Sequence, residues 1–343
     1  MTNIDLLLRP ERLGPALADA TEDDRWRAFD AELISGGKSN LTFVLRSAAG
    51  ELVLRRPPQG ELLPRAHDMR RETRVQRALA ASPVPVARIV LSVESPEMIG
   101  VPFYAMSKVD GHIIRDSIPA GYADTAADRL QLANALVDTL SQLHRVVPES
   151  IGLADFGWPD GFLARQLHRW KAQSAASQAR EVPALDNLVH KLGAALPDSP
   201  PAALVHGDFR LDNCMMDLGD PGKVAAVLDW EMSTIGDPLT DLGMLAFYWT
   251  ERDDPPVPLV PDVTSQHGFP PRTYLLERYA NLTGCDLKDF PFYEAFARFK
   301  FAVILQGIAA RSAAGAMAGQ EFDDLDGSVV RIAESGLAVL NNA

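Results

Sequence analysis

Three polar residues of the chain have the types and the order needed to act on a hydroxyl group beside a metal ion. Asp208 follows the apolar run Leu204–Val205 and opens a polar loop, and Asn213 comes five residues later. Asp229 ends a second apolar run, Val224–Leu228. An amide oxygen and a carboxylate are suitable ligands for a hard cation such as Mg²⁺, and a separate carboxylate can accept or orient a hydroxyl proton.

A further strand-like run, Cys214–Leu218, and the run Val224–Leu228 flank a turn around Pro221 and are predicted to form a β-hairpin. If Leu218 pairs with Val224, the register is symmetric about Pro221, and Asn213 falls opposite Asp229. Directly opposed residues have Cβ atoms about 4.5–5.5 Å apart. We therefore expect Asn213 and Asp229 to share one metal ion.

This arrangement suits phosphoryl transfer. The transition state of that reaction is loose, so catalysis consists mainly of positioning and charge neutralisation. Asp208 would contact the nucleophile, while Asn213 and Asp229 would hold Mg²⁺ on phosphate oxygens. Each residue alone also fits an ordinary turn or cap. Their order, with the hairpin between them, favours a common site. His144 and His206 end apolar patterns, and we expect orienting or core roles for them.

A segment rich in predicted strands precedes these residues. Strand-like runs cover 29–34, 41–46, 51–55, 87–93 and 101–109. Gly-containing turns between the first three are typical of antiparallel hairpins. One helix is predicted at about 64–81, before Ser82-Pro83. Beyond Gly111 helical patterns dominate, at 125–146, 273–282 and 291–314, whereas 253–271 is predicted to be a long loop.

The segment Ser35–Asn40 joins the first two predicted strands. Its glycines would let backbone N–H groups approach a phosphate closely, although such a pair also fits a simple turn. Gly37-Lys38-Ser39 is similar to the end of a Walker A motif. That motif requires a Gly where this chain has Glu32, and it opens a helix where this chain predicts a strand. We therefore exclude a P-loop NTPase.

Glu72 lies on the inward face of the predicted helix, beside Met69 and Val75. A buried Glu needs a partner, and Arg55 at the end of the third strand is the candidate. The pair either faces the phosphates of ATP or closes a surface contact between sheet and helix.

The sequence resembles the aminoglycoside phosphotransferase / choline kinase family of the protein-kinase-like superfamily, over about residues 28–310. Two motifs carry the resemblance: His206-Gly207-Asp208-Phe209-Arg210-Leu211-Asp212-Asn213 and Leu228-Asp229-Trp230-Glu231. Support comes from Gly36-Gly37, Leu54-Arg55, Arg71-Glu72, Gly236-Asp237-Pro238 and Asp241-Leu242.

The resemblance implies an α+β, bilobal protein-kinase-like fold. It implies a helical extension at 1–27, an ATP-binding N-lobe of antiparallel sheet and one helix at 28–108, and a mostly helical C-lobe at 109–343. The implied activity is ATP-dependent phosphotransfer to an alcohol, with ATP and Mg²⁺ as cofactors, Asp208 as catalytic base, and Asn213 and Asp229 as Mg²⁺ ligands. The implied ATP contacts are Gly36, Gly37, Lys38, Ser39, Asn40, Arg55, Glu72, Met106, Ser107 and Lys108.

The acceptor is less defined. Residues 53–58 and 229–238 are similar to the kinase-like domains attached to some acyl-CoA dehydrogenases, which implies a hydroxyacyl-type acceptor more than an antibiotic. Residues 292–311 mix phenylalanines with basic residues, as in an apolar groove for an anionic acyl compound or in an amphipathic core helix. An aminoglycoside phosphotransferase remains an alternative. Arg55 stands where the family usually has Lys, so a nucleotide-binding regulator with little turnover is another.

Composition restricts the partners. With 33 Lys and Arg against 46 Asp and Glu, the formal net charge is −13, which makes nucleic acid and anionic membranes poor partners. The two cysteines cannot form a disulfide framework. The apolar run Leu6–Leu8 is too short for a signal peptide or a membrane span. We expect a cytoplasmic protein that acts on a small-molecule acceptor, and the sequence does not indicate its oligomeric state.

Overall fold

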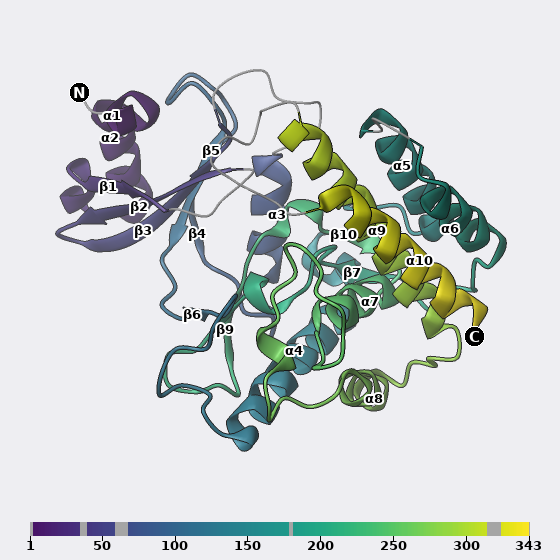
Figure 1. Cartoon of the computed structure of the whole chain (residues 1–343). Helices are drawn as coiled ribbons and strands as arrows, with labels where there is room; N and C mark the ends of the chain where they lie inside the picture. The colour runs from purple at the N-terminus through teal and green to yellow at the C-terminus, as the bar shows by residue number, and fades with distance from the viewer. Residues whose placement is uncertain (1–2, 35–39, 59–67, 178–180, 314–323, 343) are drawn as a thin grey trace. The chain divides into compact units, whose positions relative to one another are not determined.

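The computed structural model describes residues 3–34, 40–58, 68–177, 181–313 and 324–342. The chain divides into two compact units (Figure 1). The first contains residues 1–111, 151–153 and 225–233, and the second contains residues 112–150, 154–224 and 234–343. The first unit therefore takes up a short segment from the second half of the sequence, and this segment includes Asp229.

An antiparallel sheet with the strand order β1-β2-β3-β5-β4 forms the centre of the first unit. Each strand coincides with a predicted run, although β2 extends one residue beyond its run at the C-terminal end and β3 one residue beyond at each end. Their bounds are β1 Asp30–Leu33, β2 Leu41–Ser47, β3 Gly50–Arg56, β4 Ile89–Val93 and β5 Phe103–Ser107. The β2–β3 hairpin closes where Ser47 pairs with Gly50, and the φ of +132° at Gly50 is one that L side chains rarely adopt.

Side chains alternate between the two faces of this sheet, and this alternation separates two neighbouring arginines of β3. Leu52 and Leu54 belong to an apolar core shared with the N-terminal helices α1 (Asn3–Leu8) and α2 (Pro10–Thr21). The buried Arg56 follows the same face and donates from Nη1 to the Leu7 carbonyl at 2.5 Å. Arg55 therefore lies on the opposite face.

Helix α3 (Met69–Leu79) supplies Glu72 to the first unit. Asp68 caps the helix by accepting from the backbone N of Arg71 at 3.0 Å. The helix buries Met69, Glu72, Val75 and Leu79, and the inward position predicted for Glu72 is confirmed. Strand β9 (Val224–Val227), which begins at the boundary of the units, leads to a 3₁₀ turn at Trp230–Met232.

The second unit is mostly helical. Its helices are α4 (Ala126–Arg145), α5 (Phe162–Ser177), α6 (Pro183–Ala194), α7 (Leu239–Tyr248), α8 (Arg272–Thr283), α9 (Phe290–Ala313) and α10 (Leu325–Asn341). A capping box of Thr125 and Asp128 begins α4, as expected of its polar N-terminal residues. The short strands are β6 (His112–Ile113), β7 (Ala203–Val205), β8 (Cys214–Met216) and β10 (Thr234–Gly236), with β6 antiparallel to β8 and β7 to β10.

Helix α9 is the central helix of the second unit and lies beside α10 in Figure 1. Its phenylalanines at 292, 296, 299 and 301 are buried, so most of this segment is a core helix and not an open groove. Helix α7 comes very close to it, since a Cβ at Gly243 would lie 2.7 Å from the Tyr293 carbonyl oxygen. No helix among the described residues is both long and apolar enough to cross a membrane.

Candidate active site

Asp208 follows strand β7 in a loop whose contacts leave one carboxylate oxygen available. Its side chain is 20% exposed. Asn213 donates from Nδ2 to Asp208 Oδ2 at 3.0 Å, and the Nε of Arg210 lies 3.3 Å from the same oxygen. Among the described residues both contacts fall on Oδ2. The other oxygen, Oδ1, is therefore the atom that can accept a proton from a bound hydroxyl.

Asn213 closes this loop on itself. It lies in a 3₁₀ turn, Leu211–Asn213, and its Nδ2 also donates to the backbone carbonyl of Asp208 at 2.8 Å. With both donor contacts on Asp208, its amide oxygen Oδ1 is the remaining polar atom among the described residues. A hard cation binds oxygen, so the orientation of this amide fits the predicted role of Asn213 as a metal ligand.

The predicted hairpin register is wrong. The backbone N of Asp217 donates to the carbonyl of Lys223 at 2.9 Å, so Asp217 and not Leu218 closes the turn. Two aspartates cause the shift. Asp217 Oδ1 accepts from the N of Gly219 at 3.0 Å, and Asp220 Oδ1 accepts from the N of Gly222 at 2.8 Å. Such Asx contacts favour a turn of the same length that lies one residue earlier than the apolar pattern alone indicated.

As a consequence, strand pairing does not place Asn213 opposite Asp229. Asn213 precedes β8 in its 3₁₀ turn, and Asp229 follows the end of β9. Asp229 has φ +64°, the left-handed region, and it begins the 3₁₀ turn Trp230–Met232. Few non-glycine residues in proteins adopt this conformation, and those that do are concentrated at functional sites. In the same turn Trp230 is buried and donates from Nε1 to the carbonyl of Val227 at 3.0 Å.

Asp241, which the sequence had indicated only as part of a matching motif, fixes the loop that carries Asp208. It is fully buried on α7. Its Oδ2 accepts from the backbone N of His206 at 2.6 Å, and its Oδ1 accepts from the N of Gly207 at 2.7 Å. His144 Nε2 lies 3.2 Å from Oδ2, and its Nδ1 lies 2.7 Å from the Tyr279 hydroxyl. The orienting roles expected for His144 and His206 agree with these contacts.

Burial alone would raise the pKa of Asp241, but the hydrogen bond and charge of His144 and the contacts from His206 hold it below its usual value. An Asp in an otherwise apolar helix was the sequence signal that could have revealed this residue, since such a carboxylate must have internal donors.

Two further contacts hold Arg210 beside Asp208. Its Nε lies 3.1 Å from Asp212 Oδ1, and its guanidinium carbon lies 4.7 Å from the ring centroid of Tyr248. Burial raises the pKa of Asp212, while the charge of Arg210 opposes that shift. Arg210 is thus shared between two carboxylates and an aromatic face.

In the first unit Arg55 is the centre of an acidic cluster. Its Nε lies 3.3 Å from Glu72 Oε2, which confirms the predicted ion pair. Its Nη2 donates to Asp229 Oδ1 at 2.6 Å and lies 3.7 Å from Glu231 Oε2. Tyr104 completes the cluster by donating to Glu72 Oε2 at 2.8 Å. Burial raises the pKa of Glu72, and the charge of Arg55 opposes this.

Three carboxylates around one guanidinium leave an excess of negative charge at Asp229, and this excess fits the binding of a divalent cation. The described residues contain no group of three or more His, Cys, Asp or Glu side chains arranged for a metal ion. A magnesium ion in an ATP site needs fewer, because one or two protein ligands are usually supplemented by phosphate oxygens and water.

The predicted ATP contacts are only partly observable. Gly36, Gly37, Lys38 and Ser39 lie outside the described residues. Asn40 is buried, and its Nδ2 lies 3.4 Å from Glu72 Oε1.

Met106 and Ser107 end strand β5, and Lys108 follows them. The backbone N of Ser107 donates to Arg88 at 2.9 Å, and Lys108 Nζ lies 2.8 Å from Glu51 Oε2. These contacts restrict the backbone groups that an adenine ring could use at this position.

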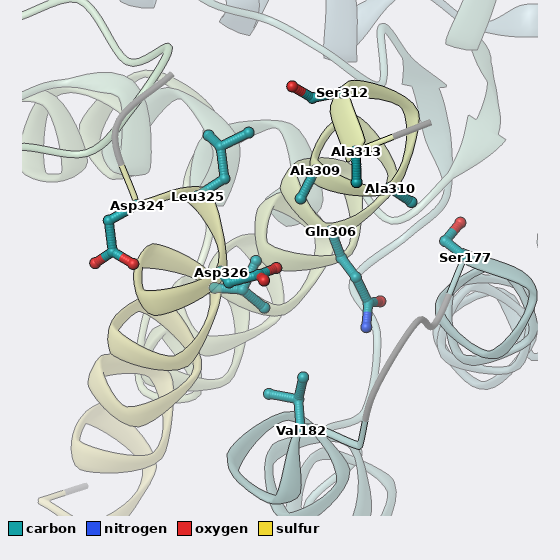
Figure 2. A pocket seen from close by; sticks show the side chains of 11 residues that line it. Ser177, Val182, Gln306, Ala309, Ala310, Ser312, Ala313, Asp324, Leu325 and Asp326 are labelled. Carbon is teal, nitrogen blue, oxygen red and sulfur yellow. The ribbon is translucent and has the colours of Figure 1, made fainter. Parts of the chain in front are cut away.

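A pocket of about 370 Å³ lies elsewhere in the second unit, between the ends of α5 and α9 and the start of α10 (Figure 2). Its walls include Ala309, Ala310 and Ala313 of α9, and its polar groups include Gln306 and Asp326. Figure 2 shows that Gln306 extends from α9 toward the space between Val182 and Ser177. None of the predicted site residues lines it.

The chain has a protein-kinase-like fold. The sequence profile of the phosphotransferase enzyme family matches residues 30–260, and the chain belongs to this family. A solved structure from Ralstonia eutropha JMP134, provisionally assigned as an aminoglycoside phosphotransferase, is 32% identical with a TM-score of 0.79, and the match covers 92% of this chain and 93% of that one. Macrolide 2′-phosphotransferase from Brachybacterium faecium shares the fold at 20% identity, with a TM-score of 0.57 and 97% and 99% coverage.

Relatives with curated names are longer proteins. Acyl-CoA dehydrogenase family member 11 of Rattus norvegicus is 38% identical over 306 residues, which is 88% of this chain and 39% of the relative. Acyl-CoA dehydrogenase family member 10 of Mus musculus is 36% identical over 290 residues, or 81% and 26%. The chain therefore spans about two fifths or less of these relatives. The predicted family and fold class are confirmed.

Proposed function

We propose that the protein transfers the γ-phosphoryl group of Mg-ATP to a hydroxyl group of a small metabolite, with Asp208 as the acceptor-facing base. The observation that carries this proposal is that the two oxygens of the Asp208 carboxylate have different contacts. Asn213 and Arg210 contact Oδ2, which leaves Oδ1 for the hydroxyl proton. A base fixed in this way stays within hydrogen-bonding reach of one defined position, as proton transfer requires.

The remaining predicted residues have complementary tasks in this proposal. The Oδ1 of Asn213 and the carboxylate of Asp229 would hold Mg²⁺, and Arg55, oriented by Glu72, would contact phosphate. Mg-ATP supplies the phosphoryl group and the positive charge that neutralises its oxygens. The protein's residues hold the reactants in line and accept the proton of the attacking hydroxyl at Asp208.

A hydroxyacyl-type acceptor is the substrate class we favour. Two cations lie close to Asp208: Lys300 binds the carbonyl of Gly207, and the Nε of Arg210 lies 3.3 Å from Asp208 Oδ2. Such cations favour an anionic acceptor over a polycationic aminoglycoside.

The alanine-lined pocket begins six residues beyond Lys300 on α9, at Gln306, and extends to Ala313. With a rise of about 1.5 Å per residue, this stretch lies about 9 to 20 Å along the helix from Lys300, a span suited to an acyl chain. The longer relatives named acyl-CoA dehydrogenases are consistent with this substrate class.

Asp208→Asn tests the assigned base. The amide keeps the shape of the side chain but cannot accept the hydroxyl proton as a carboxylate does, so we expect kcat to fall by about 100-fold or more. Steady-state kinetics with an acceptor that the wild-type protein phosphorylates would measure the loss. Asp220→Asn, in the exposed turn, is the matched control and should keep full activity. Equal turnover by Asp208→Asn and wild type would exclude the role of Asp208.

An acceptor panel tests the substrate class. ATP consumption and product mass would be measured with hydroxyacyl-CoAs, free hydroxy acids, aminoglycosides and choline. We expect phosphorylation of the anionic hydroxyacyl compounds and little of the cationic ones, because of the cations near Asp208. Preferential phosphorylation of an aminoglycoside would establish the alternative activity.

A nucleotide-binding regulator with little turnover is the second candidate, and one contact favours it. Arg55 Nη2 donates to Asp229 Oδ1 at 2.6 Å, so the strand cation occupies the carboxylate expected to bind Mg²⁺. Two measurements together would distinguish an active phosphotransferase from a regulator: the thermal shift caused by ATP with and without Mg²⁺, and turnover over the acceptor panel. ATP-induced stabilisation without turnover on any acceptor would support the regulator.

A further inference from the structure

Side chains bind most of the backbone polar groups of residues 206–208. Asp241 accepts from the N–H groups of His206 and Gly207. The N–H of Asp208 donates to His206 Nδ1 at 3.2 Å, and its carbonyl accepts from Asn213 at 2.8 Å. One group completes this series, the carbonyl of Gly207, which belongs to the same peptide unit as the N–H of Asp208.

Lys300 of α9 binds that carbonyl. Its Nζ donates a hydrogen bond to the oxygen of Gly207. The residue is 5% exposed, and its ammonium lies 5.5 Å from the ring centroid of Trp170. Among the described residues no carboxylate lies within 4.0 Å of it, so a peptide carbonyl and an aromatic face are its close partners. Gly207 has φ +87°, a conformation in which a side chain would be strained.

A buried ammonium without a close carboxylate is a costly choice for stability. Removing a charge from water costs several kcal/mol, and an apolar residue of similar length is often equally or more stable. Burial lowers the pKa of Lys300, while the more distant charges of Asp208 and Asp241 oppose the shift and those of Arg169 and Arg210 add to it. A Met would fill the same space beside Trp170. Packing therefore does not explain why this position carries a charge.

Lys300 and Asp241 hold the Gly207 residue from opposite sides. The carboxylate of Asp241 binds its N–H, and the ammonium of Lys300 binds its carbonyl. These two side chains come from α7 and α9, which pack closely at Gly243. Opposite charges at the two ends fix the orientation of both peptide planes that flank Gly207, one of which leads into Asp208, because rotation of either plane would break a charge-assisted hydrogen bond.

We propose that Lys300 is a positioning residue for phosphoryl transfer, which holds the Gly207–Asp208 peptide so that Oδ1 of Asp208 stays in place for the acceptor hydroxyl. This inference rests on the proposed function. It assigns Lys300 no contact with substrate and no proton transfer. Its charge acts through the backbone, and the neutral variant should therefore fold and bind ATP but react slowly.

Lys300→Met is the primary test in the full-length protein. We expect kcat to fall by about 10- to 100-fold, because a small displacement of a catalytic group has effects of this size, while KM for ATP stays unchanged. The melting temperature should change by no more than about 4 °C, because relief of the buried charge offsets the unsatisfied carbonyl. Arg298→Met is the matched control, since Arg298 lies on the same helix and contacts Glu294 and not the loop.

Amide hydrogen exchange of the segment 206–213 gives a second readout that needs no substrate. Faster exchange is expected in Lys300→Met and not in Arg298→Met, because the loop loses one of its fixed points. Lys300→Arg keeps a charged donor for the carbonyl and should recover part of kcat and slow the exchange again. If Lys300→Met does not fold, Lys300→Gln replaces it in the same measurements.

The outcomes separate this inference from the function on which it rests. Reduced kcat together with faster loop exchange supports it. Unchanged kcat and unchanged exchange overturn it, and so does a lower melting temperature with full kcat in the folded protein, which would show a purely structural role. If no acceptor is phosphorylated by the wild type but exchange still increases, the loop contact stands and the proposed function fails.

Discussion

The two units hold their principal aspartates in opposite ways. Asp208 is placed by its backbone, since the peptide groups around it bind buried side chains from α7 and α9. Asp229 instead follows the end of a short strand, in the left-handed region, and its carboxylate is bound directly by Arg55. One carboxylate is left with a usable oxygen, whereas the other is partly neutralised.

This difference indicates which of the two sites, the Asp208 loop or the Arg55 cluster, can rearrange when a ligand binds. A loop held through its backbone is preorganised and gains little by rearranging. A cation shared by Glu72, Asp229 and Glu231 can exchange one carboxylate for a phosphate at small cost. We therefore expect mutations around Asp208 to affect the chemical step and stability, and mutations around Arg55 to affect nucleotide and metal binding as well.

The largest effect should come from Asp241→Ala. The change leaves the buried N–H groups of His206 and Gly207 without their acceptor and removes the partner of His144, so we expect a loss of about 4 kcal/mol in the free energy of unfolding. Urea denaturation would measure it. Asp138→Ala, which breaks the more exposed pair with Arg278, is the control and should cost no more than about 1 kcal/mol. Equal losses in the two variants would contradict the backbone role of Asp241.

Arg55→Met should have the next largest effect. It leaves the fully buried Glu72 without its cation, although Tyr104 still donates to it, so we expect a loss of about 3 kcal/mol at neutral pH. The stabilisation by Mg-ATP in a thermal-shift assay should decrease at the same time. Arg46→Met, which removes an exposed ion pair at the other end of the β2–β3 hairpin, should leave both quantities nearly unchanged. If Mg-ATP stabilised Arg55→Met as much as the wild type, Arg55 would not contribute to phosphate binding.

The loss in Arg55→Met should depend on pH. Burial raises the pKa of Glu72 above its ordinary 4.5, and removal of Arg55 raises it further. The native state then holds a proton that the unfolded state has released, so stability falls as pH rises from about 4.5 toward the folded-state pKa. Urea midpoints at about pH 5 and about pH 8 should therefore differ more in the variant than in the wild type. A deficit independent of pH would show that Glu72 does not titrate in this range.

Tyr104→Phe should have the smallest effect. It removes the hydroxyl that donates to Glu72 at 2.8 Å, and the arginine remains, so we expect a loss of about 1 kcal/mol. Tyr122→Phe is the control. It removes a hydroxyl whose acceptor is the uncharged backbone carbonyl of Asp217 and not a carboxylate. A loss in Tyr104→Phe as large as that in Arg55→Met would mean that the hydroxyl, and not the guanidinium, stabilises Glu72.

Local patterns predicted the secondary structure well. The predicted strands of the N-terminal sheet and helices α4, α8 and α9 appear close to their expected bounds, because alternation and helical spacing of apolar residues decide such elements locally. The helix that carries Glu72 also appears, but it begins at Met69 and not near residue 64, because Asp68 caps it there. The Arg55–Glu72 pair was also predictable, since a Glu on an inward helix face requires a cation. The short strand β10, which pairs with β7 over only three residues, carries too little pattern to be predicted.

The hairpin register failed for a different reason. Counting from Pro221 assumed that apolar pairing decides the turn, whereas the side chains of Asp217 and Asp220 form their own backbone contacts and close it elsewhere. Lys300 was noted only as one charge in an aromatic segment. Its position inside a run of phenylalanines could have indicated a buried charge, but the sequence could not show that its partner was the carbonyl of Gly207.

The sequence by itself determined the chemical groups and their local elements: Asp208 in a loop after a strand, Asn213 close behind it, and Asp229 after a second strand. Only the tertiary structure decided how each carboxylate is held. Asp241 binds the loop from 34 residues away and Lys300 from 93, and contacts at such separations depend on how helices pack and not on local spacing. The same packing decides which oxygen of Asp208 stays available, and with it the reaction that this loop can support.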